Sequence, residues 1–132
     1  MLVAMKRESQ DATALRVLVV EDDADTAESL RLLLVVCGYH VTVACSGREG
    51  ISAAREVEPH IVLCDIGLPD SDGYGVGSML RQSPYTRAAR LIAVTGRGEA
   101  KDRLHALAAG FDEHLVKPVD ARVLLHELQV TH

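Results

Sequence analysis

Short apolar runs alternate with longer amphipathic segments along the chain. Five runs are typical of β-strands because they are rich in aliphatic residues and end at polar or turn residues: 16–20, 40–44, 61–64, 91–94 and 113–116. After each run, apolar residues recur at spacings of three and four, which predicts five helices. Strands that alternate with helices favour right-handed crossovers and a parallel sheet with helices on both faces. The pattern therefore predicts a doubly wound α/β fold.

Local signals predict where the helices begin, end and pack. Asp23 or Asp25 can cap the first helix, Ser46 and Glu49 form a candidate capping box for the second, and Pro59 stops the second. Gly75 and Gly77 each cost about 1 kcal/mol in a helix, which predicts a soft third helix. The residues expected to face the core are Ala27, Leu30, Leu33, Leu34 and Cys37, then Val76, Met79 and Leu80, then Ala100, Leu104, Leu107 and Ala108, and finally Val123, Leu124, Leu125 and Leu128.

Composition adds limits to this picture. A chain of 132 residues forms one domain, with residues 1–14 expected to be a mobile leader and 15–132 the folded part. The net charge of −5 without a basic stripe argues against a nucleic-acid-binding surface. The longest apolar run, residues 32–37, is too short to span a membrane. The three cysteines show no metal spacing and are expected to be buried thiols, so a cytoplasmic protein is expected.

Charged and hydroxyl groups follow four of the predicted strands. Glu21 and Asp22 end the first strand, Asp65 the third, Thr95 the fourth and Lys117 the fifth. Because the carboxyl ends of parallel strands share one edge, these side chains are expected to meet where such folds bind ligands. An acidic turn after the first strand also excludes the glycine-rich turn that cradles a dinucleotide's pyrophosphate.

The charges of this group predict a metal ion. Three carboxylates and one lysine sum to about −2, an unfavourable concentration of like charge in a partly desolvated pocket. Oxygen ligands with an incomplete shell suit Mg²⁺. With the charge neutralised, Asp65 could attack phosphorus while Thr95 and Lys117 bind the phosphoryl oxygens.

Four segments together give the chain a family resemblance. They are Val17–Asp23, Val62–Gly73, Ala93–Gly96 and Ala109–Pro118. The chain resembles the receiver domain of two-component response regulators over residues 16–128, nearly its whole length. The resemblance implies a flavodoxin-like (βα)5 fold whose five parallel strands lie in the order 2-1-3-4-5.

The resemblance also implies residue roles. Asp65 matches the phosphoacceptor, and the Mg²⁺ ligands match Glu21, Asp22, Asp65 and the backbone carbonyl of Gly67. Phosphate binding and switching match Thr95, Gly96, His114, Lys117 and Pro118, the last a residue that usually follows a cis peptide bond. The family pattern commonly has Tyr or Phe where this chain has His114. Gly67 and Arg97 occupy positions that tune dephosphorylation.

Partners follow from the same resemblance. The phosphodonor would be a sensor histidine kinase, or a hybrid kinase or phosphotransfer protein. A downstream protein would bind the face of the fourth helix, fifth strand and fifth helix, without direct nucleic-acid or membrane contact, and a homodimer is compatible with this.

Two other functions remain as alternatives. A small Mg²⁺-dependent phosphohydrolase would also use an aspartate at a strand end, but such enzymes carry a second aspartate where this chain has Gly67. A docking module that is never phosphorylated would not need the complete set of acidic groups, hydroxyl and lysine.

Overall fold

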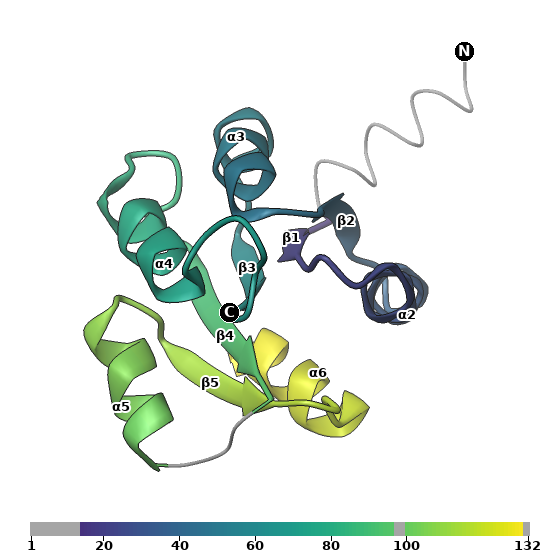
Figure 1. Cartoon of the computed structure of the whole chain (residues 1–132). Helices are drawn as coiled ribbons and strands as arrows, with labels where there is room; N and C mark the ends of the chain where they lie inside the picture. The colour runs from purple at the N-terminus through teal and green to yellow at the C-terminus, as the bar shows by residue number, and fades with distance from the viewer. Residues whose placement is uncertain (1–13, 97–99, 131–132) are drawn as a thin grey trace.

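The computed structural model describes residues 14–96 and 100–130. The predicted leader, residues 1–14, therefore lies outside the described residues except for Ala14. Among the described helices, none combines the length and the apolar character that crossing a lipid bilayer requires. The fold that follows is built from ten elements (Figure 1).

The centre of the fold is a five-stranded parallel sheet. Its strands, all parallel, are β1 (Arg16–Val20), β2 (His40–Ala44), β3 (Ile61–Asp65), β4 (Arg90–Thr95) and β5 (Glu113–Val116). They lie in the order β2-β1-β3-β4-β5, which confirms the predicted order and places β2 at an edge. β3 and β4 extend one residue further than expected at the carboxyl end, to Asp65 and Thr95.

Five helices cover the two faces of the sheet. They are α2 (Ala24–Val36), α3 (Gly47–Val57), α4 (Gly73–Gln82), α5 (Ala100–Ala108) and α6 (Ala121–Val130). α2 and α6 lie on one face, and α3, α4 and α5 lie on the other (Figure 1). The doubly wound α/β fold is thereby confirmed.

Each face of the sheet has its own apolar core. Alternate residues of β1 separate the two: Val17 and Val19 pack with Leu34, Leu124 and Leu128, whereas Leu18 and Val20 belong to the core under α3, α4 and α5. β3 is buried along its whole length. A strand buried on both faces can be apolar throughout, which is the signature that residues 61–64 carry.

The helix ends follow the local signals with one change. Asp23 caps α2, because its carboxylate accepts a hydrogen bond from the Thr26 amide. Ser46 Oγ accepts from the Glu49 amide, 3.1 Å away, but the Glu49 carboxylate accepts from the Cys45 amide rather than from Ser46 itself. In a capping box the Glu49 carboxylate would accept from the amide of Ser46, and here it accepts from the amide one residue earlier.

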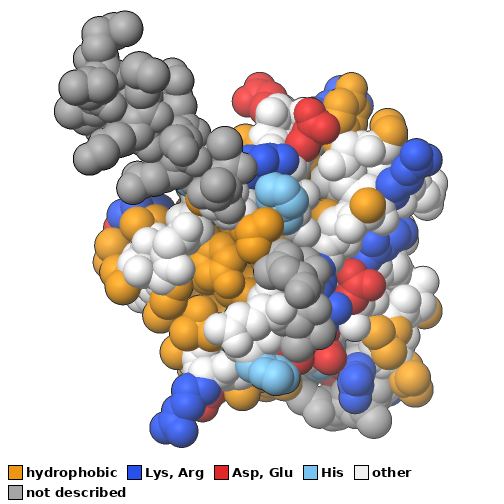
Figure 2. Space-filling view, turned by 180° about the vertical axis from the view of Figure 1, so that it is seen from behind, with side chains coloured by type: hydrophobic (Ala, Val, Ile, Leu, Met, Phe, Trp, Pro, Cys, Tyr) orange, Lys and Arg blue, Asp and Glu red, His pale blue; other side chains and the backbone are white. Residues whose placement is uncertain are grey.

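Several predicted core residues lie at the surface instead. Their exposed fractions are 58% for Met79, 67% for Leu104, 40% for Leu107 and 47% for Val123. Hydrophobic side chains also gather on the side that carries α2, at the left in Figure 2, where Leu32, Val35 and Val36 are exposed. The expectation of three buried cysteines was wrong for Cys37 and Cys45, which are exposed. Cys64 is buried, and burial raises the pKa of its thiol to about 12.

The error in α5 has a structural reason. The residue of α5 that packs into the core is Ala106, which is fully buried, and not Leu104 or Leu107. Apolar residues occur on more than one side of α5, so periodicity alone does not tell whether Ala106 or Leu104 and Leu107 face the sheet. The small residue faces the sheet because α5 packs closely on β5.

The glycines of α4 differ in what surrounds them. A Cβ on Gly77 would lie 2.3 Å from Phe111 Cε2, and a Cβ on Gly73 would lie 2.4 Å from the Ile66 Cα. A Cβ on Gly75 would meet nothing within 4 Å. Gly73 and Gly77 are therefore required by close packing, and the sequence-based expectation that Gly77 merely softens the helix was incomplete.

This contrast gives a matched pair of substitutions. We expect Gly77→Ala to destabilise the fold by about 1–3 kcal/mol, because the methyl group overlaps the Phe111 ring. Gly75→Ala should stabilise it by up to about 1 kcal/mol, because it gains only helix propensity. Urea unfolding of the two variants measures both effects. Equal effects of the two substitutions would contradict the packing argument.

Candidate functional site

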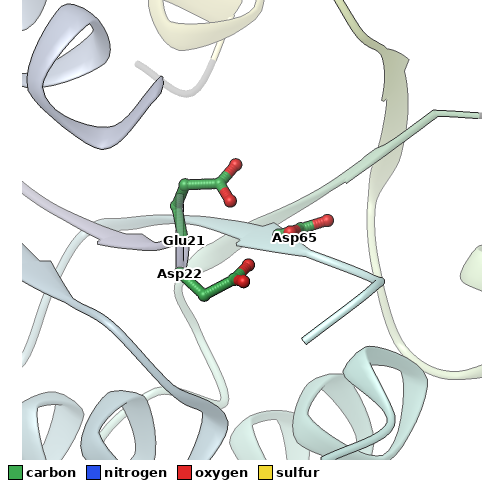
Figure 3. Close-up of side chains that lie close together, drawn as sticks. All are labelled: Glu21, Asp22 and Asp65. Atoms are coloured by element: carbon green, nitrogen blue, oxygen red, sulfur yellow. The ribbon is translucent and has the colours of Figure 1, made fainter. Parts of the chain in front are cut away.

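Three carboxylates converge at the carboxyl edge of the sheet (Figure 3). Glu21 and Asp22 follow β1, and Asp65 is the last residue of β3, the neighbouring strand. Each offers a carboxylate oxygen, and these three atoms all lie within 4.8 Å of one another. The predicted convergence of these carboxylates is confirmed.

The three carboxylates sit in different surroundings. Glu21 is 3% exposed and Asp65 7%, whereas Asp22 is exposed to solvent. Glu21 Oε2 accepts a hydrogen bond from the Asp23 amide at 3.1 Å, and Asp65 Oδ1 accepts one from the Gly67 amide at 3.0 Å. Two buried carboxylates are thereby held in place by the turns that follow their strands.

Lys117 supplies the positive charge of this group. Its Nζ lies 2.8 Å from Glu21 Oε1 and 3.3 Å from Asp65 Oδ2. Lys117 directly follows β5, and its amide donates to the carbonyl of Thr95 at the end of β4. The ammonium therefore bridges the two buried carboxylates.

The pKa values of two groups record this arrangement. Burial raises the pKa of Glu21 above its ordinary value, although the bonds from Lys117 and from the Asp23 amide oppose the shift. Partial burial lowers the pKa of Lys117, but its hydrogen bond to Glu21 and the charge of Asp65 outweigh this and raise the pKa. Negative charge is in excess, since three carboxylates and one ammonium sum to −2.

The donors in this cluster fit a hard divalent cation. They are all carboxylate oxygens, which is the chemistry that Mg²⁺ selects, and three protein ligands leave room for water and phosphate oxygens. Asp22 is exposed, so a hydrated ion could reach the cluster from solvent. The backbone carbonyl of Gly67 as a further ligand stays a prediction.

A cleft of about 620 Å³ opens beside Asp65. Thr95, Gly96 and Gly67 line it, and so do three residues that sequence reasoning missed: Tyr74, Asp102 and His105. The rings of Tyr74 and His105 stack with their centroids 3.6 Å apart. No local signal could have found this pair, because α4 and α5 meet only in the folded chain.

Pro118 and His114 are the remaining predicted residues that the structure describes. The Lys117–Pro118 peptide bond is cis, as the resemblance implied. His114 lies on β5 next to Leu115, which packs in the core under α2 and α6, so His114 points to the opposite face of the sheet. Its role as a switch residue stays a prediction, and Arg97 lies outside the described residues.

Asp70 ties the loop after β3 to α3. Its Oδ1 accepts from the Gly47 amide at 2.8 Å and its Oδ2 from the Arg48 amide at 3.1 Å. These two backbone bonds lower the pKa of Asp70. A cap supplied from 22 residues away has no local signature in the sequence.

A family model described as "Response regulator receiver domain" matches residues 17–129. The chain belongs to the response regulator receiver domain family. This confirms the resemblance read from the four motifs, and the fold and site geometry agree with it.

The chain is similar to several curated proteins, among them transcriptional regulators. It is 34% identical to a 14.6 kDa uncharacterized protein of Leptolyngbya boryana, over 91% of this chain and 92% of that protein. It is 37% identical to the transcriptional regulatory protein KdpE of Mycobacterium tuberculosis, over 77% of this chain and 44% of KdpE. The DNA-binding regulator RpaA of Synechocystis is 29% identical over 83% of this chain and 46% of RpaA. The chain thus spans less than half the length of KdpE and of RpaA.

Solved structures give the same family. A response regulator from Chloroflexus aurantiacus, 30% identical, has a TM-score of 0.85 and covers 90% of this chain and 98% of its own. The receiver domain of sensor histidine kinase PA1611 from Pseudomonas aeruginosa, 29% identical, has a TM-score of 0.81 over 89% and 97% of the two chains. That structure holds a magnesium ion in its active-site cleft.

The cap supplied by Asp70 predicts a pH-dependent stability difference. Asp70→Asn should lower the urea midpoint at neutral pH, because the ionised carboxylate accepts both amide bonds more strongly than an amide oxygen does. A depressed folded pKa means that this stabilisation is present above the unfolded pKa of about 3.9 and is lost as pH falls through the folded value. Urea unfolding between pH 7 and acid pH should show the two midpoints converging. Glu56→Gln, exposed on the same helix, is the control; a constant difference would refute the cap.

Proposed function

We propose that this chain is the phosphoacceptor of a two-component relay and that Asp65 takes the phosphoryl group from a phosphohistidine. The observation that carries the proposal is the joint position of Asp65, two further carboxylates and the Lys117 ammonium at one sheet edge. If the cluster were only a structural ion pair, Lys117 with Glu21 and Asp65 would suffice, and the exposed carboxylate of Asp22 would not be needed. Family membership supports this assignment.

The transfer is an in-line substitution at phosphorus. A carboxylate oxygen of Asp65 forms the new P–O bond while the P–N bond to the donor imidazole breaks and its electron pair passes to the ring nitrogen. Lys117, 3.3 Å from Asp65 Oδ2, would hold a phosphoryl oxygen beside that carboxylate. The Gly67 amide, bonded to Asp65 Oδ1, fixes the orientation of the carboxylate during attack.

Glu21, Asp22 and Asp65 would hold the magnesium ion, which supplies charge neutralisation at the reacting phosphoryl group when it is bound. The same pocket leaves Asp65 open on its cleft side, where water can reach the acyl phosphate. We therefore infer that the chain hydrolyses its own acyl phosphate and does not turn over external substrates.

Three residues are proposed to transmit the change. Thr95, at the end of β4, would turn its hydroxyl toward the phosphoryl group. His114 Nε2 and Asp102 Oδ2 are buried and have no hydrogen-bond partner among the described residues. An unpaired buried polar atom costs roughly 1–3 kcal/mol, so a rearrangement that pairs either atom would favour the active state.

The response would emerge on the face of α5, β5 and α6. Leu104, Leu107, Val116 and Val123 are exposed on these three elements, between 40% and 67%. We propose that a downstream protein binds there and that a histidine kinase or phosphotransfer protein supplies the phosphoryl group, in the cytoplasm. Direct binding to nucleic acid is not part of the proposal, although RpaA is a DNA-binding regulator.

The chief test is intact-mass analysis after incubation with acetyl phosphate and Mg²⁺. The wild-type chain should gain about 80 Da, the mass of one phosphoryl group, and Asp65→Asn should gain nothing. Lys117→Gln should slow labelling roughly 10²-fold because the phosphoryl oxygens lose their cation. EDTA should suppress labelling of the wild-type chain.

Three results would contradict the phosphoacceptor proposal. Labelling that persists in Asp65→Asn would place the acceptor elsewhere. No labelling of the wild-type chain, despite measured Mg²⁺ binding, would favour the docking module. Rapid turnover of p-nitrophenyl phosphate would favour the phosphohydrolase.

The switch is tested by NMR with a phosphate mimic. Adding Mg²⁺ and beryllofluoride should move amide signals of α5, β5 and α6 in the wild-type chain. Thr95→Ala should still bind the mimic at Asp65 but show markedly smaller shifts on that face. The reason is that it lacks the hydroxyl that couples Asp65 to the face of α5, β5 and α6. Equal shifts in both chains would exclude Thr95 as the coupling residue.

A further inference from the structure

A second groove lies away from the Asp65 cleft, between α3 and α4. Its volume is about 630 Å³, and its apolar lining comes from Ile51, Val76 and Met79. Val76 is buried in the core, whereas Met79 is 58% exposed. The groove is therefore apolar, with Val76 of the core at its base and the partly exposed Met79 at its edge.

The groove exists because α4 carries a glycine on its open side. Gly75 lines it, and a Cβ there would meet nothing within 4 Å. The opposite end is closed by packing, since a Cβ on Gly47 would lie 2.7 Å from Ser71. Gly75 is thus dispensable for the packing of α4 on the core, and its effect is to leave space between the two helices.

Two arginines flank this space. Arg48 and Arg55 line the groove from α3, seven residues apart, which is two helical turns or about 10 Å along one side of the helix. Within residues 14–96 and 100–130, neither guanidinium has a hydrogen bond or an ion pair. By contrast, Arg31, Arg81 and Arg90 each pair with a carboxylate.

Two carboxylates close to these arginines accept hydrogen bonds from backbone amides instead. Asp72, which also lines the groove, accepts from the Tyr74 amide, and Glu49 accepts from the Cys45 amide. The chain as a whole has a net charge of −5, but the two unpaired arginines make the surface beside this groove locally positive. Arginine and methionine are also enriched at protein interfaces.

We propose that this groove binds an acidic amphipathic helix of a partner protein. An apolar stripe on the partner would pack against Ile51, Val76 and Met79, and acidic residues two turns apart would pair with Arg48 and Arg55. A small ligand fits less well, because the lining offers few converging buried polar groups to fix its orientation. The groove is on α3 and α4, so it is separate from the proposed response face on α5, β5 and α6.

The test uses two synthetic helical peptides and the ¹⁵N-labelled full chain. Both peptides carry leucines at spacings of three and four, flanked by glutamates in one and by lysines in the other. The acidic peptide should shift the amide signals of α3 and α4, including Ile51, Gly75 and Met79. The basic peptide should bind at least about tenfold more weakly, because it meets the arginines with like charge.

Three variants locate the binding. Arg48→Glu with Arg55→Glu should weaken the acidic peptide at least about tenfold. Arg87→Glu with Arg122→Glu makes the same change in net charge at exposed arginines outside the groove and should leave binding unchanged. Gly75→Leu should fill the groove and abolish binding while the thermal melt stays at or above that of the wild-type chain.

Other outcomes would overturn the proposal. They are no binding of the acidic peptide, equal binding of both peptides, or shifts confined to α5, β5 and α6. Shifts of α3 and α4 that depend on protein concentration without peptide would make a second copy the occupant, as sedimentation would show. Acetyl phosphate labelling of each variant is measured in parallel, so loss of the groove is distinguished from loss of the phosphoacceptor.

Discussion

Repulsion between carboxylates is the constraint on which the carboxyl edge of this molecule depends. Glu21, Asp22 and Asp65 bring their oxygens within 4.8 Å of one another, and one ammonium, that of Lys117, opposes them. Removing two of these carboxylates from water adds to the cost, since burial favours the neutral form. A fold keeps such a cluster only where packing holds the backbone firmly in place or where a cation neutralises the charge. In this protein packing holds the backbone, and the carboxylate oxygens are suited to bind a cation.

The backbone around the cluster is held by the sheet and by close contacts behind it. β3 is buried along its length and pairs with β1 and β4, so Asp65 is fixed at its tip. Gly73 then brings the start of α4 against the backbone of Asp65 and Ile66. Asp70 fastens the intervening loop to the amides that begin α3. The position of Asp65 is therefore set by packing on three sides, independent of any ligand.

The surfaces of the molecule differ in what they offer. The Asp65 cleft is polar and acidic, the face of α5, β5 and α6 exposes single large apolar residues, and the α3–α4 groove joins apolar surface to unpaired arginines. The loop from Asp65 to Gly73 borders both the cleft and the groove. A partner bound in the groove would therefore contact the segment that positions the phosphoacceptor.

The sequence alone determined the element order, the doubly wound class and the set Glu21, Asp22, Asp65, Thr95 and Lys117, because strand ends in a parallel sheet must share an edge. The strand order and the family came from recognised motifs rather than from periodicity. Only the tertiary structure decided which stripe of α5 is buried, that Met79 is exposed, and that Gly77 packs on Phe111. It also decided the Asp70 cap and the Tyr74–His105 stack. The reason is physical: periodicity records that a helix has an apolar side, but the neighbour that covers that side is supplied by residues far away in the chain.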